Sequence, residues 1–320
     1  MSSATPPRTT FSTSAPSTSL LLHELNCADR AGRLASSSSL TVTEVDASEA
    51  PACMLELGRL REETFRRVGE GTGRTHDIDN FDVGYRQLVL WDEANHCIVG
   101  GYRLGAVDEL LRRGGIEALY TRSLFAFDSR LVGSLAPAVE LGRSFIHPSY
   151  QRHPATLFLL WKAIGAWLVR HPCYRHLIGP VTLSPLYSEP ARALMLAWLE
   201  IHAMDSTRAG LVAPLNPLQP DVRADWQSLA RALPDADALD QAVKDREGGR
   251  QGLPVLLRQY LRLGARLLSA SVDPAFGGAT DCLMQLDLHA MPETLRVRYM
   301  GKSGALAWAA RQDRDHCAVC

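Results

Sequence analysis

Hydrophobic and polar residues follow regular patterns from about residue 41 onward, and these patterns predict both strands and helices. Residues 155–170 carry apolar side chains at helical spacing, whereas residues 41–45 alternate between polar and apolar positions as a strand does. A turn of five residues, 92–96, joins two predicted strands into a hairpin. The predicted strands are residues 41–45, 87–91, 97–104, 138–146, 176–183 and 282–288, and the predicted helices are residues 49–68, 155–170, 190–199 and 253–268. Strands alternating with helices predict an α/β (α+β) fold built on a mixed sheet.

The chain ends and one internal segment lack these patterns. Sixteen of the first 20 residues are Ser, Thr, Pro or Ala, so residues 1–40 are predicted to be a disordered tail rich in Ser, Thr and Pro. Residues 205–250 hold four prolines and many alternating charges, and we expect an insertion that covers the domain. The chain is then expected to form one domain from 41 to 302, followed by a C-terminal tail from 303 to 320.

Composition narrows the class of protein. The chain has 320 residues, with 34 Lys and Arg against 35 Asp and Glu, and this balance argues against nucleic acid as a partner. Its seven cysteines are scattered and odd in number, which is typical of a protein in a reducing cytoplasm. No apolar run reaches the roughly 18 residues that span a bilayer.

Common catalytic and metal-binding motifs are absent from the sequence. It contains no phosphate-binding Gly-Lys-Ser loop, no Gly-x-Ser-x-Gly elbow and no zinc-spaced set of Cys and His. A Cys-x-x-Cys pair, Cys317 and Cys320, stands at the end of the chain, where no framework is expected to hold a redox or metal site. We therefore expect no metal and no tightly bound cofactor.

An acidic turn and a buried arginine are the first features that indicate chemistry. Asp77, Asp79 and Asp82 surround Phe81, and acids this close need a cation or water as a partner. Taken alone, this segment is also compatible with a solvated loop. Arg103 stands within an otherwise apolar strand, so its charge must be paired or lie at an exposed edge.

A second charged pair, Glu140 and Arg143, lies within another apolar strand. Residues three apart point to opposite faces of a regular strand, so both reach one cavity only across a bulge, which Gly142 permits. A structural Glu–Arg pair is the alternative. A tight turn and a long amphipathic helix follow this strand, and the start of such a helix offers N–H groups to a phosphate.

These pieces together resemble the Gcn5-related N-acyltransferase (GNAT) superfamily. The likeness is strongest to its long-chain acyl branch, the ornithine- and glycine-lipid N-acyltransferases often described as hemolysin-like, which are related to the acyl-homoserine-lactone (autoinducer) synthases. Five segments match in order: Leu60–Arg61 with Phe65, Asp79–Asp82 with Tyr85, Val99–Leu104, Val139–Ser144 and His147–Tyr150. Residues 256–264, 273–276 and 298–301 also look like the lipid-forming branch.

The resemblance implies a fold and a reaction. The expected sheet is mostly antiparallel, is flanked by helices, and has a V-shaped splay at the fourth strand. The expected reaction moves a long-chain fatty acyl group, with or without a 3-hydroxyl group, from acyl carrier protein to the amino group of an amino acid such as ornithine or glycine. A synthase that uses S-adenosylmethionine, and an inactive binding module, are the alternatives. The expected location is the cytoplasm, with any contact to a membrane surface peripheral.

The resemblance also implies roles for particular residues. Glu140 is expected to be the general base, with Arg143 and Asp82 as further catalytic residues. Substrate binding is expected from Arg61, Phe65, Asp79, Phe81, Arg103 and Ser144, and a backbone N–H near Ser144 is expected to stabilise the oxyanion.

The donor is expected to bind where the fourth strand turns into the long helix. Gln151, Arg152, His153 and Thr156 occupy the position of the superfamily's pyrophosphate cradle, but the glycines of that motif are missing here. Their absence favours the single phosphate of acyl carrier protein as the donor's anchor, while acyl-coenzyme A stays open as a co-substrate.

Overall fold

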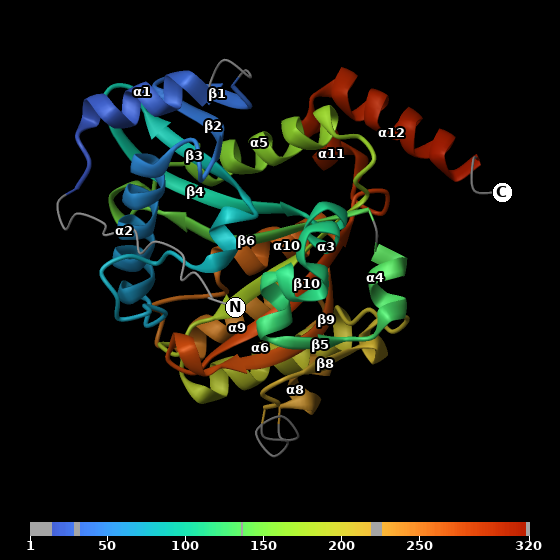
Figure 1. Ribbon diagram of the computed structural model, residues 1–320. Coiled ribbons are helices and arrows are strands. Elements are labelled where there is room, and N and C mark those ends of the chain that lie inside the picture. Colours follow the sequence, from blue (N-terminus) through green and yellow to red (C-terminus); the bar gives the residue numbers. More distant parts are fainter. Residues whose placement is uncertain (1–14, 29–32, 136, 219–225, 318–320) are drawn as a thin grey trace, which may run out of the picture.

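An eight-stranded sheet runs through the computed structural model, which describes residues 15–28, 33–135, 137–218 and 226–317 (Figure 1). The strand order is β1-β2-β3-β4-β6-β7-β10-β9, and β5 pairs separately with β8. The strands are β1 (Ala35–Ser37), β2 (Leu40–Asp46), β3 (Arg86–Asp92), β4 (Cys97–Ala106), β5 (Phe125–Phe127), β6 (Ala138–Ile146), β7 (His176–Leu183), β8 (Val212–Pro214), β9 (Arg266–Asp273) and β10 (Ala279–Asp287). Every pairing in the large sheet is antiparallel except that of β6 with β7.

The parallel pair β6 and β7 separates after three residues. Ala138–Glu140 pairs with His176–Ile178, and the two strands then diverge. A Cβ atom on Gly179 would lie 2.1 Å from the carbonyl oxygen of Leu141, so only glycine allows the strands to approach this closely at the apex. The mostly antiparallel sheet with a splay at the fourth predicted strand is therefore confirmed.

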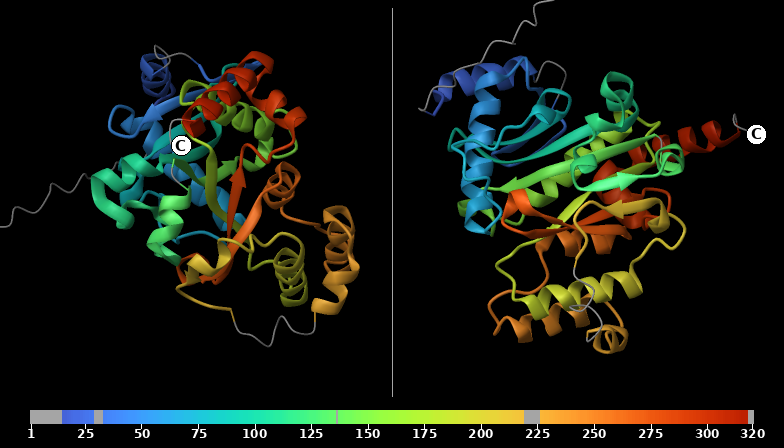
Figure 2. Two further views of the ribbon diagram at one scale, coloured as in Figure 1. Left: turned by 90° about the vertical axis from the view of Figure 1, so that its right-hand side faces the viewer. Right: turned by 60° about the horizontal axis from the view of Figure 1, so that its bottom comes forward.

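Helices cover both faces of the sheet (Figure 2). The α-helices are α1 (Thr18–Ala28), α2 (Pro51–Arg67), α3 (Val107–Gly114), α4 (Ser129–Leu135), α5 (Thr156–Arg170), α6 (Glu189–His202), α8 (Gln227–Ala232), α9 (Ala236–Arg246), α10 (Val255–Leu263), α11 (Glu293–Met300) and α12 (Lys302–Cys317). The largest core cluster joins one face of the sheet to α5, α6, α9 and α10. On the other face, α1 and α2 cover one end of the sheet, while α3, α4 and the β5–β8 pair cover the other end.

A bulge in β6 changes the direction of its side chains. Tyr102 of β4 faces two residues of β6, because Gly101 pairs with Phe145 and Arg103 pairs with Gly142. Arg143 has a φ of 50°, in the left-handed region that a residue with a side chain rarely adopts. The expected bulge is present, although Arg143 rather than Gly142 takes the unusual backbone conformation.

The N-terminal 40 residues are more ordered than their composition indicates. Helix α1 buries Leu21 and Leu25 against α2, and the Glu24 carboxylate accepts hydrogen bonds from the backbone N–H groups of Ala52 and Cys53. The prediction of a disordered tail is therefore wrong for α1 and β1, because Leu21 and Leu25 form a buried apolar stripe that holds α1 against α2. Residues 1–14 lie outside the described part.

Two predictions near the C-terminus also need correction. The helix predicted over 253–268 ends at Leu263, because Gly264 takes a left-handed φ of 88° and β9 then begins at Arg266. The predicted tail at 303–320 instead contains α12, whose Trp308 is fully buried and donates a hydrogen bond to the Tyr174 carbonyl. Cys320 lies outside the described residues.

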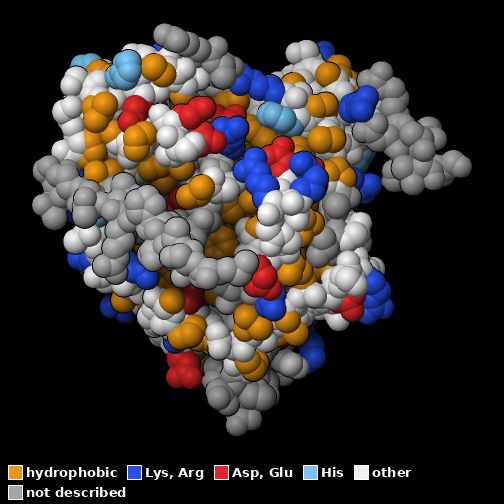
Figure 3. Space-filling model, in the orientation of Figure 1, with side chains coloured by type: hydrophobic (Ala, Val, Ile, Leu, Met, Phe, Trp, Pro, Cys, Tyr) orange, Lys and Arg blue, Asp and Glu red, His pale blue; other side chains and the backbone are white. Residues whose placement is uncertain are grey.

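The segment from 205 to 250 contributes α8 and α9, which pack against α6 as an outer layer. Leu239 and Val243 of α9 are fully buried and belong to the main core. This layer therefore covers α6 and also extends the core. On the face shown in Figure 3, basic and acidic side chains are interspersed, as the net charge of −1 leads one to expect.

Candidate active site

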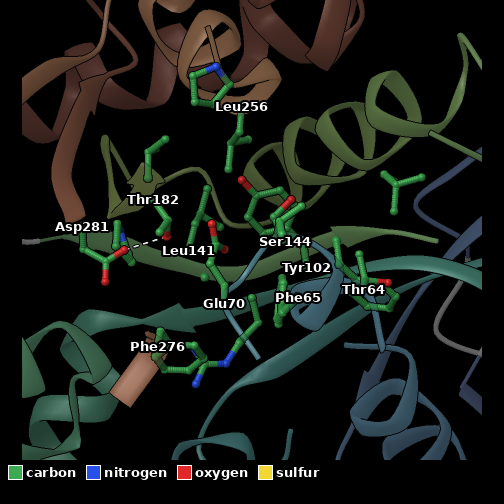
Figure 4. Close-up of a pocket in the computed structure, with 18 of the residues that line it drawn as sticks. Thr64, Phe65, Glu70, Tyr102, Leu141, Ser144, Thr182, Leu256, Phe276 and Asp281 are labelled. Carbon is green, nitrogen blue, oxygen red and sulfur yellow. Dashed lines mark hydrogen bonds between the residues drawn. The ribbon is translucent and has the colours of Figure 1, made fainter. Parts of the chain in front are cut away.

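A cavity of about 260 Å³ lies where β6 and β7 separate, and it passes through the sheet. Leu141, Val181 and Leu256 line the end that faces α10. Arg143, Phe276 and Asp281 line the opposite end. In Figure 4, Leu256 and Phe276 lie on opposite sides of the strand that carries Leu141 and Ser144. Two groups that enter from opposite faces of the sheet can therefore meet in this cavity.

The acidic turn before β3 is held by hydrogen bonds within the turn, and its carboxylates also pair with arginines. Asp79 caps the short 3₁₀ helix η2 (Asn80–Val83) by accepting from the Phe81 N–H at 2.9 Å, and Asp82 accepts from the Asp79 N–H at 3.0 Å. Asp82 is 2.9 Å from a nitrogen of Arg61, whose other terminal nitrogen donates to the Gln87 side chain at 2.6 Å. The turn is therefore a built element and not a solvated loop.

Two further arginines complete a charge-balanced network. Arg103 contacts Asp79 at 2.8 Å and Asp82 at 3.5 Å, and Arg143 contacts Asp77 at 3.0 Å and Asp79 at 3.1 Å. We call the six residues Arg61, Arg103, Arg143, Asp77, Asp79 and Asp82 the Arg–Asp network. Three positive charges meet three negative charges, which is the condition for burying them.

The network sets the ionisation of Asp82. Burial alone would raise the pKa of Asp82, but the charges of Arg61 and Arg103 outweigh it and lower that pKa to about 2. Arg103 is fully buried, and its guanidinium lies 4.9 Å from the ring centre of Tyr120 and 5.1 Å from that of Tyr85. Asp82 and Arg103 therefore stay charged across the physiological pH range.

Glu140 lies beside the network but does not line the cavity. One carboxylate oxygen accepts a short hydrogen bond from the Tyr85 hydroxyl, and the other accepts from the Thr121 N–H at 2.7 Å. Burial raises the pKa of Glu140, which is 1% exposed. Its role as the base stays a prediction, but both of its oxygens are engaged in holding Tyr85 and the short 3₁₀ helix η4 (Tyr120–Ser123).

Of the other residues predicted to bind the acceptor, some line the cavity and others pack behind its lining. Phe65 and Arg143 line the cavity. Phe81 lies outside the lining, where its ring meets that of Tyr120 edge to face at 5.6 Å. The two terminal nitrogens of Arg143 donate to the Tyr120 hydroxyl at 3.0 Å and to Asp79 at 3.1 Å, while its Nε lies 3.0 Å from an Asp77 oxygen as an ion pair. Each terminal nitrogen thus keeps one N–H group that has no hydrogen-bond partner among the described residues.

Only some of the residues predicted to lie on the donor side line the cavity. Ser144 lines the cavity, and its hydroxyl hydrogen-bonds to Tyr102, whose pKa is raised to about 12 by burial. Gln151 lines the cavity rim, whereas Arg152 and His153 are exposed. Thr156 is buried and donates its hydroxyl to the His153 carbonyl at 2.9 Å, so it closes the turn before α5 instead of facing a ligand.

Two carboxylates that the sequence analysis did not select also line the cavity. Asp281 is 4% exposed, and burial raises its pKa to about 6. Burial, with the charge of Asp281, raises the pKa of Glu70 to about 8. The available signal was an acidic residue, Asp281, directly before the predicted strand 282–288, but nothing local linked it to Glu70.

Comparison with known proteins decides the family. Residues 60–162 match the model of the acetyltransferase (GNAT) domain. The chain is 31% identical over 287 residues to a glycine N(alpha)-acyltransferase of Bacteroides thetaiotaomicron, covering 85% of this chain and 84% of the relative. An L-ornithine N(alpha)-acyltransferase of Rhodobacter capsulatus is 30% identical over 231 residues, covering 70% of this chain and 79% of the relative. The chain belongs to this N-acyltransferase family.

Solved structures give a more distant likeness to this N-acyltransferase. The acyl-homoserine lactone synthase LasI aligns with a TM-score of 0.41 and 12% identity, covering 83% of this chain and 96% of LasI. A likeness at this level bears on neither mechanism nor substrate. Within the described residues, no helix has both the length and the hydropathy needed to cross a bilayer. In the same part of the chain, no group of three or more His, Cys, Asp or Glu residues is placed to hold a metal ion.

Proposed function

We propose that this N-acyltransferase moves a fatty acyl group from a thioester to the α-amino group of a small amino acid, such as glycine or ornithine. The observation that supports this most directly is the cavity that crosses the sheet, with an apolar end facing α10 and a charged end between β6, β10 and α2. An acyl chain and an amino-acid zwitterion need these two unlike environments. The names of the relatives agree with this class of acceptor.

The apolar end is proposed to hold the donor. Leu141, Val181 and Leu256 offer apolar surface to the acyl-thioester arm as it enters between β6 and β7. Gln151 lies at the rim, and the exposed Arg152 and His153 follow it on the turn before α5. A positively charged rim suits the acidic surface of acyl carrier protein, which we propose as the donor's carrier, with acyl-coenzyme A as the alternative.

The charged end is proposed to hold the acceptor. The two unused N–H donors of Arg143 suit a carboxylate, and the Phe276 ring lies 4.8 Å from that guanidinium and closes the cavity beside it. The bulge at Arg143 interrupts the pairing of β6 with β4, which makes a backbone N–H near Ser144 available to the thioester oxygen. An oxyanion donor of this kind contributes on the order of 10²-fold to the rate.

The reaction needs no covalent acyl-enzyme. The α-amino group must be neutral to attack, and because its pKa is near 8, only about a tenth is neutral at pH 7. A carboxylate that accepts the proton helps by a factor of ~10²–10⁴, and holding both reactants in one cavity supplies much of the remainder. The fatty product would partition into a membrane, so we propose a cytoplasmic enzyme whose contact with the membrane is peripheral.

The test supplies purified protein with a long-chain acyl carrier protein thioester or the matching coenzyme A thioester, together with glycine, ornithine or S-adenosylmethionine. We expect mass spectrometry to detect an N-acyl amino acid, formed faster from the carrier-protein thioester. If a lactone forms from S-adenosylmethionine, the protein is an autoinducer synthase and this proposal is wrong. If no amine consumes either thioester, the proposed donor and acceptor classes are wrong.

A further inference from the structure

We propose that Glu70 and Asp281 together accept the proton of the acceptor's ammonium group, the task that the sequence assigned to Glu140. This inference rests on the proposed function and names residues for its central step. We call Glu70 and Asp281 the carboxylate pair. Both line the charged end of the cavity, where the attacking nitrogen must arrive, and Glu140 does not.

Asp281 is held in place at one oxygen and open at the other. It faces Thr182 directly across the β10–β7 ladder, and the Thr182 hydroxyl donates to its Oδ1 at 2.6 Å. Figure 4 shows this bond beside the cavity. Among the described residues no hydrogen bond to Oδ2 of Asp281 is present, and the residue as a whole is 4% exposed. A carboxylate oxygen without a donor, on a residue that lines a cavity, is placed to accept a proton from a ligand.

Glu70 lies in a loop that is held by contacts with Glu62, Ser184 and Gly277. The buried Glu62 accepts hydrogen bonds from the Thr72 N–H at 2.9 Å and the Gly73 N–H at 3.0 Å. The Ser184 hydroxyl donates to the Val68 carbonyl, and the turn at Gly277 packs against the Gly69 carbonyl so closely that an added Cβ would lie 2.7 Å from it. Within the described chain, no cation forms an ion pair with the Glu70 carboxylate.

Proximity couples the two ionisations. Burial, followed by the charge of Asp281, raises the pKa of Glu70 to about 8, while burial raises that of Asp281 to about 6. Because interacting sites titrate as a unit, the pair holds about one proton near neutral pH and keeps one ionised carboxylate. That carboxylate is much closer in basicity to an α-amino group, with a pKa near 8, than an ordinary aspartate is.

Other charged and titratable groups also face the pair. Arg143 of β6 lowers the pKa of Asp281, and Asp273 of β9 raises it. Burial raises the pKa values of Tyr120 in η4 and of Tyr187, which follows β7, to about 12, and the charges of Asp281 and Glu70 respectively add smaller contributions in the same direction. These tyrosines stay protonated near neutral pH, so the pair is the group in this neighbourhood that changes charge between about pH 6 and 8.

This assignment accounts for every proton that the nitrogen loses in the reaction. The nitrogen enters as an ammonium group with three protons and leaves as an amide with one. The ionised member of the pair takes the first proton, and the neutral amine attacks the thioester carbon. The C–S bond then breaks, and the departing thiolate takes the second proton from nitrogen. Glu70, which is half-buried, returns the first proton to solvent.

The test compares Asp281→Asn and Glu70→Gln with Asp287→Asn, a matched change on the same strand where Asp287 pairs with Arg175 outside the cavity. We expect Asp281→Asn to lower kcat/KM at pH 7 by about 100-fold and to recover in part near pH 9.5, where the acceptor is already neutral. Glu70→Gln should lose about tenfold, and Asp287→Asn less than twofold. A loss that is equal at every pH, or no loss in Asp281→Asn, would overturn the assignment.

A second variant keeps the assignment testable if Asp281→Asn folds poorly. Thr182→Val removes the hydrogen bond that lowers the pKa of Asp281 and keeps the side-chain shape. We expect the acidic limb of the kcat/KM profile to move to higher pH by about half a unit or more, with kcat at high pH unchanged. An unmoved limb contradicts the inference. A parent enzyme that acylates no amine instead contradicts the proposed function, so the two failures are distinguishable.

Discussion

The Arg–Asp network and the carboxylate pair lie on the same side of the sheet, yet they treat charge in opposite ways. In the network, three arginines meet three aspartates at short distances, and the pKa of Asp82 is lowered to about 2. In the carboxylate pair, two acids line a cavity with no ion pair to any residue that the structure describes, and their pKa values are raised to about 6 and 8. Charges that neutralise one another fix a shape, whereas charges left unneutralised beside a cavity remain available to a substrate.

Removing Arg103 should have the largest effect on this contrast. Arg103 is fully buried against Asp79 and Asp82, so Arg103→Met leaves the three carboxylates of the Arg–Asp network with two arginines and should lower the free energy of unfolding by about 3–5 kcal/mol. The matched control is Arg86→Met on β3, where Arg86 is half exposed beside Asp46 and should cost less than about 1 kcal/mol. Denaturant unfolding measures both, and equal costs would show that burial of the network contributes nothing.

Asp281→Asn should change stability in the opposite direction. A folded pKa of about 6, above the ordinary aspartate value of 3.8, means that ionisation destabilises the folded chain above about pH 6. At pH 8 the variant should therefore be more stable than the parent by about 2 kcal/mol, and this gain should vanish as pH falls from 6 to 4. Thermal unfolding at several pH values checks this, and a less stable variant at pH 8 would mean that Asp281 is mainly structural.

The same linkage has the reverse sign for Asp82. Its folded pKa of about 2 lies below the ordinary aspartate value, so its contribution to stability is present above about pH 4 and is lost as pH falls toward 2. Acidification should thus first relieve the carboxylate pair and later break the Arg–Asp network.

Glu140→Gln tests which region contains the base. The substituted amide cannot accept from both the Tyr85 hydroxyl and the Thr121 N–H, so we expect a loss of about 1–3 kcal/mol in stability. Activity should fall less than in Asp281→Asn, and the acidic limb of the pH–rate profile should keep its position. If that limb disappears, Glu140 is the base after all.

The smallest expected effect concerns the rim. Arg152→Ala removes an exposed charge near the cavity mouth, and we expect KM for the acyl carrier protein thioester to rise about two- to fivefold, less so at high salt. KM for the coenzyme A thioester and kcat should hardly change. An equal rise for both donors would point to a contact with the pantetheine arm that they share.

The sequence predicted the central strands for physical reasons that act locally, and it indicated that the acidic turn and Arg103 each need a partner of opposite charge. Periodicity identified β6 and α5, and a charge within an apolar strand, such as that of Arg103, requires an opposite charge nearby. That these partners are one another, in a single Arg–Asp network, is seen only in the structure. Helix α1 was missed because its one buried stripe stands in a segment dominated by Ser, Thr and Pro.

The carboxylate pair and the place of Glu140 could not be predicted in the same way. Glu70 follows α2 and Asp281 lies on β10, and only the closing of the sheet brings them to one cavity. Glu140 was identified by its position in a motif, but its distance from the cavity depends on Tyr85 and Thr121, which the motif does not specify. Function at this site arises from long-range packing.

Gly179 lies at the point where β6 and β7 begin to separate. Since its bare α-carbon sits against the Leu141 carbonyl, any larger residue would push the two strands apart from the bottom of the V upward. The width of this opening therefore depends on Gly179, and under the proposed function that width limits the thickness of the acyl chain that can enter. Engineering that aims at bulkier or slimmer acyl chains should begin at this narrow end of the slot, rather than at the side chains along its walls.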